Sequence, residues 1–99
     1  MLNITPEHLV IIQKILSHYP IQAMAFGSRV KGTNRKYSDL DLCLLNTVPM
    51  STVSFLREEF EESNLPFEVD IICWELITED FRNKIKPDLT DITITINET

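Results

Sequence analysis

Two aspartates one residue apart, Asp39 and Asp41, stand at the start of an apolar run that is typical of a β-strand. Side chains alternate between the two faces of a strand, so both carboxylates lie on one face and the leucines between and after them lie on the other. Neighbouring carboxylates repel each other, and burial strengthens that repulsion. A divalent cation relieves it, and oxygen-only ligands suit Mg²⁺ or Mn²⁺. The pair therefore predicts a strand with one buried face and a metal site at its beginning.

The segment before these aspartates has the features of a phosphate-binding turn. Gly27 has no Cβ atom and lets a phosphate approach the backbone closely, and Ser28 can cap a helical turn whose free N–H groups attract anions. Basic residues then follow with no acid between them, although the chain has a formal net charge of −6. They are Arg29, Lys31, Arg35 and Lys36. The first two are the stronger phosphate candidates because they lie nearest to the turn, and the other two are the weaker ones.

A third aspartate, Asp70, lies inside the apolar run 67–74. Burying a carboxylate in such a run is costly unless it is paired or bound to a metal. Taken alone, an edge strand facing water explains this residue equally well. Because Asp39 and Asp41 require a third ligand or a catalytic base, we interpret Asp70 as part of the same site.

The remaining patterns alternate between helix and strand and predict a single α/β domain over residues 1–99. Capping residues and helical spacing predict helices over 5–18, 51–64 and 78–85. Apolar or alternating runs predict strands over 21–26, 39–45, 67–74 and 92–96. Val10 and Ile11 widen the apolar surface of the first helix beyond one stripe, which predicts a homo-oligomer or a complex with a partner protein.

Composition excludes several classes of protein. A hydrophobic content of 43% is typical of a globular chain, and the acidic balance argues against direct binding of nucleic acid. No apolar run approaches the roughly 20 residues that cross a bilayer, and no signal peptide is apparent, so we expect no membrane partner. Cys43 and Cys73 both fall in predicted strands and are interpreted as reduced core residues of a cytoplasmic protein.

The spacing of these motifs resembles a known signature. Gly27-Ser28, ten further residues and then Asp39-Leu40-Asp41 are similar to the pattern of the DNA polymerase β-like nucleotidyltransferase superfamily. The short chain and the form Gly-Ser-Arg-Val-Lys-Gly resemble its minimal nucleotidyltransferase (MNT) branch, which is often paired with HEPN-domain toxins. The resemblance implies the nucleotidyltransferase fold, a small mixed β-sheet with helices packed mainly on one face.

The same resemblance implies roles for individual residues. Asp39 and Asp41 would hold two Mg²⁺ ions, for which Mn²⁺ can substitute, while Asp70 completes one metal site and helps to activate the attacking hydroxyl. ATP would be the substrate, and AMP would be transferred as pyrophosphate leaves. The nucleotide-binding residues would be Gly27, Ser28, Arg29 and Lys31.

By resemblance, the leading acceptor is a tyrosine hydroxyl of a HEPN ribonuclease toxin, which would make this chain the antitoxin. Two alternatives stay open. One is transfer to a small molecule, as in aminoglycoside nucleotidyltransferases, and the other is a non-catalytic module that neutralises a toxin by contact. The presence of all three aspartates favours an enzyme, and the small size and acidic balance favour a protein acceptor over RNA.

Overall fold

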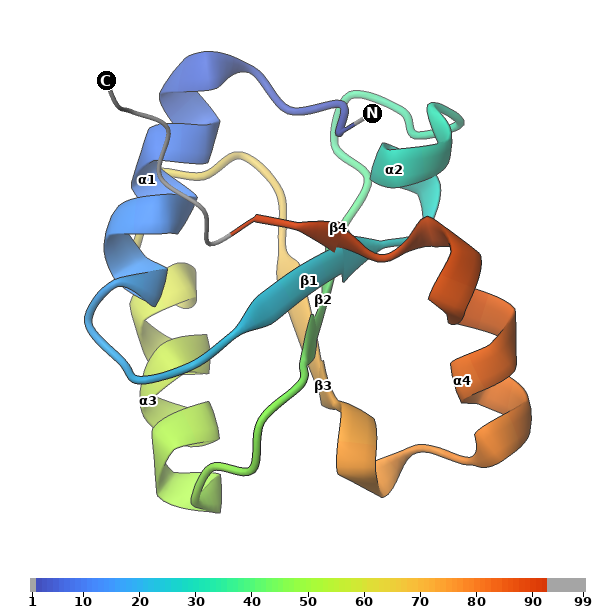
Figure 1. Cartoon of the computed structure of the whole chain (residues 1–99). Helices are drawn as coiled ribbons and strands as arrows, with labels where there is room; N and C mark the ends of the chain where they lie inside the picture. Colours follow the sequence, from blue (N-terminus) through green and yellow to red (C-terminus); the bar gives the residue numbers. More distant parts are fainter. Residues whose placement is uncertain (1, 93–99) are drawn as a thin grey trace, which may run out of the picture.

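A computed structural model describes residues 2–92, and its centre is one four-stranded sheet in the order β3-β2-β1-β4 (Figure 1). The strands are β1 (Ala23–Phe26), β2 (Leu40–Leu44), β3 (Val69–Cys73) and β4 (Thr90–Asp91). Strand β1 is antiparallel to both β2 and β4, whereas β2 and β3 are parallel. The sheet is therefore mixed, which confirms the α/β prediction.

The helices cover both faces of this sheet unequally. Helices α1 (Pro6–Leu16) and α3 (Met50–Glu61) lie on one face, and the shorter α4 (Glu79–Ile85) lies on the other (Figure 1). The connections include one turn of α-helix, α2 (Ser28–Lys31), and two short 3₁₀ helices, η1 (Trp74–Leu76) and η2 (Lys86–Asp88). Helix α3 forms the crossover that parallel neighbours such as β2 and β3 require. Within residues 2–92, no helix is long and apolar enough to cross a membrane.

Local sequence explains where these helices begin. Pro6 occupies the first turn of α1, where a missing N–H costs nothing. Thr78 caps α4, because its hydroxyl oxygen accepts a hydrogen bond from the Phe81 N–H at 3.2 Å. Both starts agree with the sequence prediction.

Alternation along β2 divides the core into two parts. Its leucines point toward α1 and α3, while Asp41 and Cys43 point toward α4. The larger core includes Ile12, Ile15, Leu40, Leu42, Leu44, Val53, Leu56, Phe60 and Ile71. The smaller one, on the α4 side, contains Phe26, Cys43 and Ile85. The predicted metal-binding face of β2 is thus the less completely covered face of the sheet.

Two further predictions concern the ends of the chain. The predicted strand 92–96 lies outside the described residues except for Ile92, and the observed edge pairing comes from Thr90 and Asp91, opposite Ala25 and Met24. On α1, Val10 is 62% exposed, as predicted, whereas Ile11 is partly buried and packs against the larger core. Association through this helix stays a prediction.

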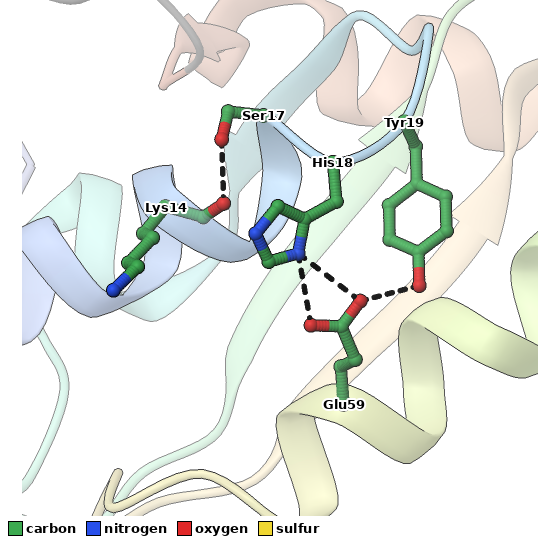
Figure 2. Close-up of polar contacts among 5 residues, drawn as sticks. All are labelled: Lys14, Ser17, His18, Tyr19 and Glu59. Carbon is green, nitrogen blue, oxygen red and sulfur yellow. Dashed lines mark hydrogen bonds and ion pairs between the residues drawn. The ribbon is translucent and has the colours of Figure 1, made fainter.

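A cluster of polar side chains joins the end of α1 to α3 (Figure 2). The Tyr19 hydroxyl donates a hydrogen bond to Glu59 Oε1 at 2.5 Å, and His18 Nδ1 lies 3.0 Å from Glu59 Oε2. The pKa of Tyr19 is raised to about 12, mainly because its hydroxyl donates this hydrogen bond. The pKa of Glu59 is lowered, mainly because its carboxylate accepts the same bond. The ionised carboxylate is therefore the form that the folded state prefers.

This preference predicts how stability depends on pH. A carboxyl group whose pKa is lowered by folding stabilises the protein above its unfolded pKa, and that contribution is lost as the pH falls through the folded pKa. We expect Glu59→Gln to lower the Tm at pH 7, with a difference from wild type that shrinks below about pH 4. Circular dichroism melting curves across this range measure the effect, with the exposed Glu62→Gln as control. A difference that is independent of pH would contradict the assignment.

Candidate active site

The carboxylates singled out in the sequence lie together at the beginning of β2 and β3. Asp41 sits in the middle of the sheet, directly opposite Asp70 of β3 on one side and Phe26 of β1 on the other. Asp39 immediately precedes β2. Burial raises the pKa of Asp41, and the negative charges of Asp70 and Asp39 raise it further. The three carboxylates are therefore close enough to interact, with Asp41 between the other two.

The Asp41 carboxylate itself requires a glycine at position 27. Its φ of +86° is rarely adopted by residues with a side chain, and a Cβ atom at this position would overlap the Oδ2 atom of Asp41. The sequence predicts that the missing Cβ atom of Gly27 leaves room for a phosphate. The structure places the Asp41 carboxylate in that room, so the turn is matched to the aspartate on the neighbouring strand β2.

The turn after Gly27 supplies donors for an anion. Helix α2 begins at Ser28, and the backbone N–H groups of Ser28 and Arg29 donate no hydrogen bond to any of the described residues 2–92. Lys31 is about half exposed, with its Nζ 3.6 Å from Oδ2 of Asp88. The turn thus brings backbone donors and one cationic side chain to the Gly27 end of β1. Their role in nucleotide binding stays a prediction.

Arg29 does not lie where the sequence interpretation placed it. Its side chain is buried, and its guanidinium donates to three backbone carbonyls, those of Ser38 (2.9 Å), Asn3 (3.1 Å) and Lys36 (3.2 Å). The same group lies 4.0 Å from the centroid of the Phe67 ring. Burial lowers the pKa of this arginine. Arg29 therefore holds the basic loop against the domain and is not directed at a phosphate, which corrects the prediction for this residue.

We expect Arg29→Ala to lower the free energy of unfolding by about 2 kcal/mol, because three partly buried hydrogen bonds to backbone carbonyls are lost. Arg29→Lys should recover only part of this loss, since an ammonium group cannot reproduce the planar fork of a guanidinium. Urea unfolding measures both variants, and Arg35→Ala, in the exposed part of the same loop, is the control. Wild-type stability of Arg29→Ala together with lost ATP affinity would restore the phosphate-binding role.

The donor set at Asp39, Asp41 and Asp70 fits a divalent cation. Burial is the main cause that raises the pKa of Asp41, and the charges of Asp70 and Asp39 add to it, so a cation here would favour the ionised carboxylate. Within residues 2–92 no three His, Cys, Asp or Glu side chains are placed so that they could together hold a metal ion. Mg²⁺ does not need three protein ligands, because it binds through one or two carboxylates and completes its shell with water and substrate phosphates. These residues would hold the ion, and the nucleotide would supply the remaining oxygens.

Beyond Asp39 and Asp70, a groove of about 670 Å³ runs from the carboxylates toward α3. Its lining includes Tyr37 and Arg57. The Nη2 atom of Arg57 donates to the backbone oxygen of Ile71 at 3.0 Å. Neither residue is predicted as part of the site by the sequence pattern. The only signal for Arg57 was a single basic residue on an otherwise acidic helix, which does not reveal that the helix passes the edge of β3.

A second hollow of about 450 Å³ lies on the other side of Tyr37, Pro66 and Phe67, which line both spaces. Its charged lining is basic and comes from Arg29, Arg35 and Lys36. The structure thus separates the two weaker phosphate candidates from the carboxylates by the wall that contains Tyr37.

Comparisons with known proteins agree with this geometry. The family model described as polymerase beta, nucleotidyltransferase, matches residues 11–94. A protein of Haemophilus influenzae named "Probable protein adenylyltransferase MntA" is 43% identical over 89 residues, which cover 86% of this chain and 78% of that protein. The matched regions include the Gly27-Ser28 turn and all three aspartates.

Proposed function

The chain belongs to the polymerase β-like nucleotidyltransferase family, and from this premise we propose that it transfers AMP from ATP to a tyrosine hydroxyl of a HEPN ribonuclease toxin. In this role it acts as the antitoxin of a cytoplasmic pair. The name of the Haemophilus influenzae relative, a protein adenylyltransferase, supports a protein as the acceptor. The choice of a HEPN toxin and of tyrosine rests on the resemblance of the Gly27 to Lys31 segment to MNT proteins.

The observation that carries the proposal is the position of Asp41. It is half-buried between two further carboxylates, and the chain keeps a glycine at position 27 that leaves space for it. A purely structural residue at this place would be uncharged, because burial and repulsion both disfavour the carboxylate. A group kept at such a cost is typical of a functional site.

The residues divide the chemistry between them. Asp39 and Asp41 hold the divalent cations, and Ser28 with Lys31 orients the β- and γ-phosphates of ATP. When bound, the cations stabilise the charge on the entering and leaving oxygens of an in-line displacement. Asp70 is exposed at the β3 side of the pair, so it can accept the proton of the acceptor hydroxyl. The hydroxyl oxygen then bonds to the α-phosphorus as the bond to the pyrophosphate oxygen breaks.

ATP radiolabelled at either the α- or the γ-phosphorus tests this reaction. The candidate HEPN protein should become labelled from α-labelled ATP only, in the presence of Mg²⁺, and EDTA should abolish the label. Label from γ-labelled ATP would indicate phosphoryl transfer instead. Labelling of a small molecule with none on the protein would favour the aminoglycoside-type alternative.

A further inference from the structure

The charged lining of the groove that ends at Asp39 and Asp70 is mainly acidic, and this charge suits a basic acceptor better than a nucleotide. Four of its lining residues are acidic, namely Asp39, Glu61, Glu68 and Asp70. The basic lining residue, Arg57, already donates to the backbone of Ile71. Glu61 and Glu68 lie outside the proposed metal ligands, so their charges repel a polyanionic nucleotide and attract a segment that carries positive charge.

The position of the groove supports an acceptor as its occupant. It opens on the β3 side of Asp41, and the Gly27-Ser28 turn lies on the β1 side, since β2 runs between β1 and β3. Asp70, the proposed base, forms part of the groove lining itself. A hydroxyl bound here would lie beside the group that takes its proton, which is the arrangement that proximity catalysis requires.

The edge of β3 adds backbone groups to this groove. Leu40 N–H donates to the Glu68 carbonyl at 2.9 Å, so in the parallel ladder the backbone of residues 68 and 70 faces β2. The backbone of Val69 and Ile71 therefore faces away from β2, as the bond from Arg57 to the Ile71 carbonyl shows. Val69 lines the groove, and β3 is the outer strand of the described sheet on this side. An extended segment can thus hydrogen-bond to the edge of β3.

Resting on the function proposed above, we infer that this groove is the acceptor site and that it selects an extended segment whose hydroxyl-bearing residue is flanked by basic side chains. Glu61, at the end of α3, and Glu68, just before β3, are both exposed and act as the specificity-determining residues. Neither belongs to the carboxylate set that holds metal. Their charges can therefore be changed without altering the catalytic groups.

Charge reversal provides a matched pair of variants. Glu61→Lys/Glu68→Lys changes the groove, and Glu58→Lys/Glu62→Lys makes the same change in net charge with exposed glutamates of the α3 region that do not line it. The probes are two fluorescent synthetic peptides with one central tyrosine, flanked by lysines in one and by glutamates in the other. Fluorescence anisotropy at low salt measures their Kd values, and melting curves check that each variant is folded.

We expect wild type and Glu58→Lys/Glu62→Lys to bind the lysine-flanked peptide about tenfold more tightly than the glutamate-flanked one, a gap that closes at high salt. Glu61→Lys/Glu68→Lys should lose or reverse this preference while its affinity for Mg²⁺-ATP stays unchanged. The same peptide preference in both double variants, or no preference in wild type, would contradict the assignment of this groove as the acceptor site. Because the readout is binding, it is independent of AMP transfer, so a failure of the proposed reaction would appear separately in the radiolabel experiment.

Discussion

Asp41→Asn is expected to reduce AMP transfer by at least about 100-fold, a loss comparable with removing one group that stabilises the transition state electrostatically. The same substitution should make the metal-free protein more stable at pH 7. Burial and the charges of Asp70 and Asp39 raise the pKa of Asp41, so the folded state disfavours its ionised form. A neutral amide of the same shape removes that penalty, so lost activity and gained stability should occur together, as the trade-off between stability and activity at active sites predicts.

The sign of this effect can be checked against pH. A carboxyl group whose pKa is raised by folding destabilises the protein once it ionises, so its penalty is present above the folded pKa and absent below the unfolded one. The Tm advantage of Asp41→Asn in EDTA should therefore vanish below about pH 4. Glu58→Gln, which removes an exposed carboxylate, is the control. If Asp41→Asn were less stable than wild type at pH 7 in EDTA, the electrostatic account of the site would be wrong.

Gly27→Ala is expected to damage both stability and activity. The backbone at Gly27 has φ +86° and ψ −155°, a region that only glycine adopts readily, and a strained residue there costs of order 1–3 kcal/mol. The new methyl group would also overlap the Asp41 carboxylate and displace it. We therefore expect a loss of about 3 kcal/mol in the free energy of unfolding and a transfer rate close to that of Asp41→Asn.

The chain provides a matched control in its only other glycine. Gly32 has φ +80°, but nothing lies within 4 Å of a Cβ built there. Gly32→Ala should thus cost only about 1 kcal/mol through its backbone conformation and leave transfer intact. Urea unfolding and transfer assays compare the two variants. Equal losses would mean that the contact between Gly27 and Asp41 contributes nothing beyond conformation.

The parts of the fold that could be predicted are those determined by local pattern. The leucines of β2 alternate with Asp41 and Cys43, and this period of two identifies both the buried face and the functional face. The resemblance carried by Gly27-Ser28 and the aspartates supplied the family. Neither observation requires knowledge of contacts between distant residues.

The parts that could not be predicted depend on such contacts. The burial of Arg29 arises because three carbonyls and the Phe67 ring converge on it, and a basic residue in a basic loop is ordinarily solvated. The contact of Gly27 with Asp41 depends on the register of β1 against β2. Arg57 reaches the groove only because α3 passes the edge of β3. These features follow from packing, which the periodicity of one segment does not determine.

The most direct test of the central claim is intact-mass spectrometry of the candidate HEPN toxin after incubation with this chain, ATP and Mg²⁺. Wild type should add one or more AMP units to the toxin, and Asp39→Asn/Asp41→Asn should add none and fail to neutralise it. Neutralisation by that double variant without any change in the mass of the toxin would contradict the enzymatic account and show that this chain acts by contact alone.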